Sequence, residues 1–139
     1  MKVIRVQQQD GAIAHYIIGH LVEKEAGGPT AEDVHSLLTD ERTYLFAAMA
    51  NSGEVIGYAL AYRFPALYRP GGLAYLYDIE VAQAHRRKGI GRLLIEAVLR
   101  YLKVDGVTEM WLGTDTDNEA AQALYSATSG QRSEGAISS

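Results

Sequence analysis

The sequence predicts one α+β domain with a mixed, mostly antiparallel sheet, in the order β-α-α-β-β-β-α-β-α. Three consecutive segments between residues 43 and 81 have the apolar runs and alternation of strands, with turn-forming residues between them. Apolar residues of segment 89–104 recur at helical spacing. The chain has 139 residues, 47% of them hydrophobic, which fits one globular domain over residues 1–139.

The N-terminal third predicts one strand and two helices. Residues 2–7 alternate as a short strand. Asp10 stands at the N-cap position of a helix whose apolar residues continue to Val22, before the Gly-Gly-Pro segment 27–29. Thr30 and Asp33 have the spacing of a capping box, so a second helix begins there and reaches residue 38.

The middle of the chain predicts a β-hairpin followed by a third strand. Residues 43–50 and 54–64 are strands around the turn 51–53, and the loop 65–72 leads to a strand over 73–81. In the second strand, one face is expected to hold Ile56, Tyr58, Leu60 and Tyr62. In the third, strict alternation puts Leu73, Tyr75, Tyr77, Ile79 and Val81 on one face and Ala74, Leu76, Asp78 and Glu80 on the other.

The C-terminal part predicts a helix over 89–104, a strand over 107–113 and a last helix to residue 127, which Thr116 and Glu119 would cap. Residues 126–139 form a small, polar tail, and Ile137 is the large apolar residue of its last ten positions. The final strand is therefore expected to be short or absent, unless a truncated chain or a partner chain explains the gap.

Composition excludes several classes of site and partner. The net charge of −4 disfavours a broad nucleic-acid-binding face. The apolar runs are shorter than the ~18 residues of a membrane span, and residues 1–11 lack a signal-peptide core, so a cytoplasmic protein without a membrane partner is expected. The absence of cysteine removes thiolate ligands and a cysteine nucleophile, and the four histidines are not spaced as metal ligands, so no metal site is expected.

One segment carries an anion-binding pattern. Arg86, Gly89 and Gly91 fit R-x-x-G-x-G between a predicted strand and a predicted helix. The first turn of a helix presents unpaired N–H groups, and glycine lets a phosphate approach the backbone. A dinucleotide-binding turn fits poorly because a β-hairpin precedes the motif, and a Walker loop fails because no Gly-Lys-Ser/Thr follows.

With the preceding hairpin, this segment resembles the GCN5-related N-acetyltransferase (GNAT) superfamily, whose R-x-x-G-x-G/A motif binds the pyrophosphate of acetyl-CoA. Residues 118–125 resemble a second motif of that family, N-x-x-A-x-x-L-Y. The resemblance covers residues 1–125 and implies an αβα-layered fold with splayed central strands, and acetyl-CoA as cosubstrate. The implied acetyl-CoA contacts are Ile79, Glu80, Val81, Arg86, Arg87, Lys88, Gly89, Ile90, Gly91, Arg92, Asn118 and Tyr125.

The resemblance also implies direct transfer of acetyl to an amine without an acyl-enzyme. Tyr125 would then protonate the departing CoA thiolate. A carboxylate beside the thioester would accept the proton of the amine, and Asp78 is the first choice for this catalytic base. Glu80, two residues further along the strand, is the second choice.

Within the superfamily, residues 75–81 and 85–90 resemble the Y-x-Y-D-[LI]-x-V and H-R-R-x-G-I motifs of aminoglycoside 3-N-acetyltransferases. The implied acceptor is the 3-amino group of deoxystreptamine, and the implied outcome is antibiotic resistance. Asp78, Asp115, Asp117 and Glu119 would bind this polycation. The acids from 115 to 119 also fit ordinary enrichment at a helix start.

Several alternatives remain open at this point. A polyamine, another small amine or a protein amine could be the acceptor, and a non-catalytic module that binds acyl-CoA would share the same fold. The chain departs from the family after Tyr125, where Ser129 and Gly130 replace the usual Gly and large residue. A homodimer is expected from the resemblance and from the missing final strand.

Overall fold

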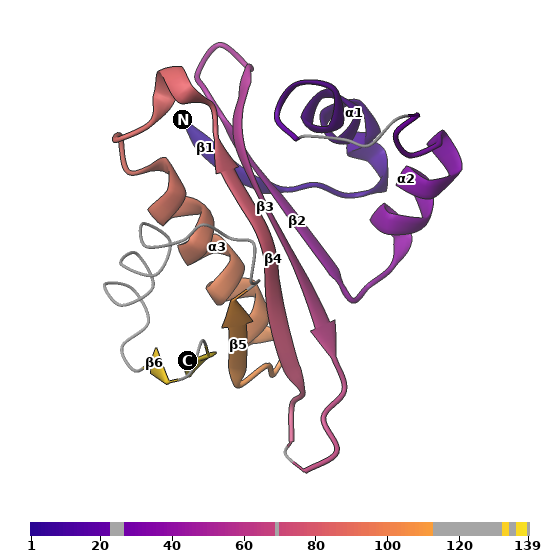
Figure 1. Cartoon of the computed structure of the whole chain (residues 1–139), viewed down its shortest axis with the longest axis vertical. Helices are drawn as coiled ribbons and strands as arrows, with labels where there is room; N and C mark the ends of the chain where they lie inside the picture. Colours follow the sequence, from indigo (N-terminus) through magenta and orange to yellow (C-terminus); the bar gives the residue numbers. More distant parts are fainter. Residues whose placement is uncertain (23–26, 69, 113–131, 134–135, 139) are drawn as a thin grey trace.

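The computed structural model describes residues 1–22, 27–68, 70–112, 132–133 and 136–138 (Figure 1). Its strands are β1 (Lys2–Arg5), β2 (Thr43–Met49), β3 (Val55–Phe64), β4 (Leu73–Val81), β5 (Glu109–Leu112), β6 (Arg132–Ser133) and β7 (Ala136–Ser138). In the described residues they form one sheet of order β1-β2-β3-β4-β5-β7-β6. The β4–β5 pair is parallel and the other pairs are antiparallel, which confirms the predicted α+β class.

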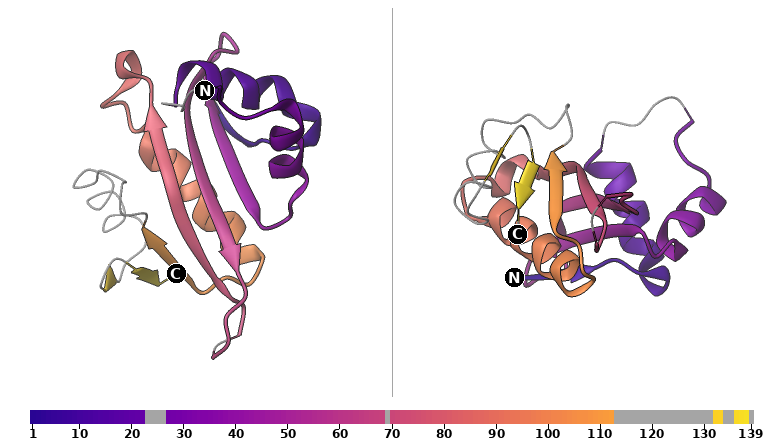
Figure 2. Two further views of the ribbon diagram at one scale, coloured as in Figure 1. Left: turned by 45° about the vertical axis from the view of Figure 1, so that its right-hand side comes forward. Right: turned by 90° about the horizontal axis from the view of Figure 1, so that it is seen from below.

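Helices cover both faces of the sheet. The short helices η1 (Gln8–Asp10) and η2 (Gln83–His85) accompany α1 (Gly11–His20), α2 (Ala31–Thr39) and α3 (Ile90–Val104). The helices α1 and α2 lie against one face and α3 against the other, so that the layers are α, β and α (Figures 1 and 2). In the part of the chain described, no helix has the length and apolar content that a membrane span requires.

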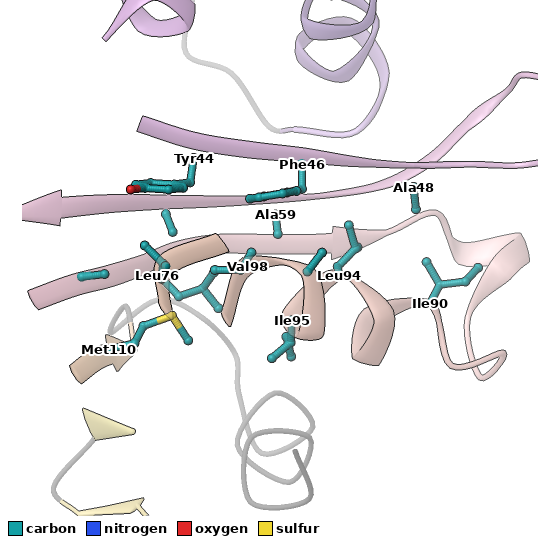
Figure 3. Packing of buried hydrophobic residues seen from close by; sticks show 14 of the residues in the cluster. Tyr44, Phe46, Ala48, Ala59, Leu76, Ile90, Leu94, Ile95, Val98 and Met110 are labelled. Carbon is teal, nitrogen blue, oxygen red and sulfur yellow. The ribbon is translucent and has the colours of Figure 1, made fainter. Parts of the chain in front are cut away.

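Two hydrophobic clusters hold these layers together. The larger lies between the sheet and α3 and buries Phe46, Leu76, Leu94, Ile95 and Val98 completely (Figure 3). The smaller lies between the sheet and the α1–α2 pair. The sheet separates the two clusters, so each of its faces has its own set of side chains.

The predicted N-caps differ in outcome. The capping box of α2 is confirmed: Asp33 N donates to Thr30 Oγ1 at 3.1 Å, and Thr30 N donates to Asp33 Oδ2 at 2.9 Å. Asp10 occupies the N-cap position of α1, but its side chain accepts a hydrogen bond from Gln7 N at 3.0 Å instead. Asp10 therefore caps η1, which the sequence pattern did not predict.

A β-bulge in β4 corrects the predicted faces of that strand. Leu60 pairs with Asp78 while Ala61 pairs with Leu76, so Tyr77 is an extra residue opposite β3. Leu76 is buried under α3, whereas Asp78 lines a cavity on the α1–α2 side. The prediction that Asp78 and Leu76 share a face is therefore wrong, because the extra residue shifts the alternation by one position.

A second bulge lies in β3. Met49 pairs with Val55 and Ala48 pairs with Gly57, which leaves Ile56 as the extra residue. Ile56 packs in the α3 cluster, while Tyr58 packs in the α1–α2 cluster. The predicted common face of Ile56 and Tyr58 is wrong for the same physical reason.

The last strands agree with the prediction of a short final strand. The strand β7 pairs antiparallel with β5, with Ile137 opposite Met110. Because this chain's own β7 extends the sheet beyond β5, the predicted homodimer loses one of its two arguments. The predicted final helix to residue 127 lies outside the described residues.

One buried tyrosine ties the far end of α3 to the sheet. Tyr44 in β2 is completely buried and donates a hydrogen bond from its hydroxyl to Asp105 Oδ2 at 2.6 Å. Asp105 is the C-cap residue of α3, and the Arg5 guanidinium lies 4.3 Å from the centre of the Tyr44 ring. Burial, followed by the bond to Asp105, raises the pKa of Tyr44 to about 12, so the hydroxyl stays a donor at neutral pH.

We expect Tyr44→Phe to lower the free energy of unfolding by about 1–2 kcal/mol, because it removes a part-buried hydrogen bond from a buried tyrosine to a carboxylate. Urea unfolding measures this loss as a lower midpoint with an unchanged slope. The control is Tyr68→Phe, since Tyr68 is 94% exposed. Equal midpoints for the two variants would contradict the expectation.

Candidate active site

The turn between β4 and α3 has the backbone geometry of an anion site. Arg87 and Gly89 both adopt left-handed conformations, with φ of 65° and 79°. Gly89 is the N-cap residue of α3 and has no side chain with which to cap this helix start. A Cβ built at Gly89 would meet no atom within 4 Å, so the space beside the turn is open. The free N–H groups of the first turn can therefore reach a phosphate.

The basic residues of this turn have different surroundings. Arg86 donates from Nε to the Val81 carbonyl oxygen at 3.0 Å and forms an ion pair with Glu80 at 2.6 Å. Arg86 therefore fastens the turn to the end of β4. Arg87 and Lys88 are exposed, which leaves their charge at the surface beside the open helix start. Ile90 is buried under the sheet, so that its backbone and not its side chain faces this site.

The edge of β4 leads directly into this turn. The described β4–β5 ladder ends at the pair of Leu76 with Leu112, whereas β4 stays paired with β3 as far as Val81. Within the described residues, 77–81 therefore have no strand beside them on the β5 side. Figure 1 shows β4 continuing past the end of β5 toward the turn before α3. This edge, free of a described neighbour, contains Ile79, Glu80 and Val81, the predicted contacts of the pantetheine arm.

Asp78 lies on the face of the sheet that α1 and α2 cover, where it lines a cavity of about 330 Å³. The cavity lies between the sheet and the α1–α2 pair, and most of its lining is aliphatic. Its lining residues include Ile17, Val34, Leu37, Leu60, Tyr58 and Asp78. The hydroxyl of Tyr58 donates a hydrogen bond to Asp78 Oδ2. A carboxylate in such a place can bind an ammonium group and accept its proton.

The structure thus distinguishes the two predicted carboxylates. Asp78 and Glu80 are two residues apart on a regular part of β4, but Asp78 binds Tyr58 and Glu80 binds Arg86. Glu80 is joined to the anion-binding turn, whereas Asp78 belongs to the cavity. This geometry favours Asp78 over Glu80 as the group that meets an acceptor amine.

Five of the predicted site residues have no described position. Asn118 and Tyr125, and the acidic residues Asp115, Asp117 and Glu119, lie outside the described residues. Arg92 is exposed on α3 and donates to Glu96 at 3.2 Å. Over the described ranges, no three His, Asp or Glu side chains gather as metal ligands.

Sequence analysis missed Tyr58 as a residue of this site. Periodicity alone assigns it to the hydrophobic core, which is correct for its ring, since the residue is 3% exposed. The signal lies in the register: Tyr58 pairs with Glu80, which puts it diagonal to Asp78 on the next strand. That relation depends on the bulge at Tyr77 and cannot be read from alternation.

Comparison with known proteins identifies relatives. Residues 14–130 match the profile of the Acetyltransferase (GNAT) family. The chain is 33% identical over 105 residues to N-acetyltransferase family 8 member 3 of Rattus norvegicus, which covers 69% of this chain and 45% of the rat protein. It is 40% identical over 52 residues to the [ribosomal protein bS18]-alanine N-acetyltransferase of Salmonella typhimurium, which covers 37% of this chain and 35% of that protein.

Solved structures extend the likeness to nearly the whole chain. The crystal structure of an aminoglycoside acetyltransferase from an uncultured soil metagenomic sample superposes with a TM-score of 0.81 at 25% identity, covering 95% of this chain and 92% of that chain. By contrast, this chain spans less than half the length of the two curated relatives. The structural likeness therefore includes both the turn before α3 and the α1–α2 side.

Proposed function

This chain belongs to the acetyltransferase (GNAT) family, and from that premise we propose that it transfers the acetyl group of acetyl-CoA to an amine of an aminoglycoside. The observation that carries the proposal is that β4 borders both the start of α3 and a cavity on the other face of the sheet. Its edge beyond Leu76, which has no partner strand among the described residues, leads into the start of α3, and its bulge turns Asp78 toward the cavity. A donor on one side and an acceptor on the other would meet at residues 77–80.

The turn before α3 and the adjoining edge of β4 fit the pyrophosphate and the extended pantetheine arm of acetyl-CoA. The open space beside Gly89 and the helix start give N–H donors, and Arg87 and Lys88 add positive charge. The edge of β4 beyond Leu76, which no described strand pairs with on this side, offers backbone groups to the amides of pantetheine. These residues bind and orient acetyl-CoA, which supplies the acetyl thioester.

In the proposed reaction the acceptor nitrogen loses two protons, and Asp78 receives the first. The acceptor arrives as an ammonium ion and gives one proton to Asp78, directly or through water. The nitrogen then bonds to the thioester carbonyl carbon, the carbon–sulfur bond breaks, and nitrogen loses its second proton as the amide forms. The departing thiolate gains one proton, which the motif resemblance assigns to Tyr125. Ammonium and acetyl-CoA thus become amide, CoA thiol and one proton, without an acyl-enzyme, in keeping with the absence of cysteine.

The aminoglycoside assignment is supported by charge and by likeness. Asp78 carries a carboxylate into the cavity, and by resemblance Asp115, Asp117 and Glu119 would add three more acidic groups for a polycation. The solved aminoglycoside acetyltransferase is similar over nearly its whole length. We propose the 3-amino group of deoxystreptamine as the acceptor and antibiotic resistance in the cytoplasm as the outcome.

A second candidate acceptor is an amine attached to an apolar or peptide group. The aliphatic lining beside Asp78 favours it, because apolar walls bind an apolar substituent better than a polycation. One relative is named as acting on the alanine of a ribosomal protein. The following experiment separates the two acceptors.

Release of CoA thiol from acetyl-CoA is measured with gentamicin-type and kanamycin-type aminoglycosides, spermidine and short peptides with an N-terminal alanine. We expect aminoglycosides to give the highest kcat/KM, and NMR of the product to place the acetyl on the 3-amino group. Faster turnover of peptides or spermidine would overturn the assignment while keeping acetyl transfer. No thiol release, with CoA still raising the melting temperature, would favour a binding module without catalysis.

We expect Asp78→Asn to lower kcat by about 100-fold or more, because the amide cannot accept the amine proton. Binding of acetyl-CoA, measured by calorimetry, should stay as in the parent. The matched control is Asp105→Asn, which also removes a carboxylate that accepts from a buried tyrosine, at the far end of α3. Equal turnover of parent and Asp78→Asn would exclude Asp78 as the base.

We expect Gly89→Ala to weaken CoA binding about tenfold, because a left-handed φ disfavours any side chain and the new Cβ would project into the space left for phosphate. Gly106→Ala is the control. Gly106 also has a left-handed φ, of 86°, but lies beyond the other end of α3. Calorimetry should find the parent affinity in Gly106→Ala, and an unchanged affinity in both variants would contradict the proposed cosubstrate site.

A further inference from the structure

Tyr58 combines a fixed ring with one polar atom. The residue is 3% exposed, and its ring belongs to the cluster that α1 and α2 form with the sheet. The rotamer is thus held by packing against side chains such as Ile17 and Val34. Its hydroxyl is the polar tip of a buried residue, and it donates to Asp78 Oδ2.

The two strands bring this donor to Asp78 by their register. Leu60 is the direct partner of Asp78, and Tyr58 is the direct partner of Glu80. A diagonal neighbour on the same face of a sheet is within reach of an aromatic side chain. The bulge at Tyr77 puts Asp78 on that face, so the contact depends on both strands.

The hydrogen bond from Tyr58 leaves the Asp78 carboxylate able to bind an amine. A carboxylate has two oxygens, and the bond from Tyr58 takes up a site on Oδ2, so the other oxygen can meet an amine. Burial, followed by the hydrogen bond to Asp78, raises the pKa of Tyr58 above its usual range. Tyr58 therefore remains a protonated donor whenever Asp78 is charged.

We propose that Tyr58 is a positioning residue for acetyl transfer, whose hydroxyl holds the Asp78 carboxylate in the orientation that receives the amine proton. The inference rests on the proposed function, because it assigns Tyr58 a part in the same reaction. A carboxylate on a free side chain would rotate between staggered rotamers. The hydrogen bond from the anchored Tyr58 restricts this rotation. A base held in the reactive orientation lowers the entropic cost of reaching the transition state.

The test is Tyr58→Phe, which keeps the ring and removes the hydroxyl. Relative to the parent, kcat should fall about tenfold with an unchanged KM for acetyl-CoA. Tyr44→Phe is the matched control: it loses a tyrosine–aspartate bond of the same kind in the other cluster, and its kcat should stay as in the parent.

A second measurement does not depend on activity. In protein labelled with ¹³C at aspartate carboxyl groups, the signal missing from Asp78→Asn identifies Asp78, and its chemical shift at one neutral pH is compared between the parent and Tyr58→Phe. A changed chemical shift in Tyr58→Phe supports the inference. An equal chemical shift in the two proteins, or a kcat that falls equally in Tyr44→Phe, would overturn it.

The two proposals fail differently. If the parent transfers acetyl to no amine of the panel, the proposed function fails, and the role of Tyr58 in transfer fails with it even where the carboxyl signal shows the bond. If the parent is active and Tyr58→Phe keeps its kcat, the proposed function stands and the positioning role is wrong.

Discussion

The structure depends on one extra residue in its central strand. Because Tyr77 has no direct partner on β3, the side chains before and after it follow different alternations. Leu76 and Ile79 both pack toward α3, while Asp78 points to the cavity under α1 and α2. Without the extra residue, strict alternation would place Asp78 on the same face as Leu76, in the core under α3.

Two hydrogen bonds beyond the bulge hold the two carboxylates in separate places. Glu80 is drawn to Arg86, whose guanidinium also binds the carbonyl of Val81 and fastens the turn that opens α3. Asp78 is drawn to Tyr58. The Glu80–Arg86 pair is exposed and contributes little to folding stability, so its effect lies in the geometry of the turn. The hydrogen bond from Tyr58, by contrast, connects the proposed catalytic base Asp78 to the hydrophobic cluster under α1 and α2.

Periodicity predicted the elements well because burial repeats with the period of each structure. The strands β2, β3 and β4 and the helix α3 lie within one residue of their predicted bounds. The bulges were not predictable, because Ile56 and Tyr77 are ordinary strand residues and a bulge is a property of the pairing between two strands. For that reason the faces were wrong, and the partner of Asp78 could be found only from the register. Asp10 shows the same limit, since its side chain had a second local donor in Gln7.

The separation of the two hydrophobic clusters by the sheet has an evolutionary consequence. The larger cluster, under α3, supports the turn that we assign to the donor, whereas the smaller cluster, under α1 and α2, forms the wall around Asp78. Substitutions in the smaller cluster would reshape the cavity that we propose for the acceptor without touching the side chains that set the start of α3. A lineage with this architecture can therefore exchange one amine for another by drift on α1 and α2, while the use of one common acyl carrier is inherited unchanged.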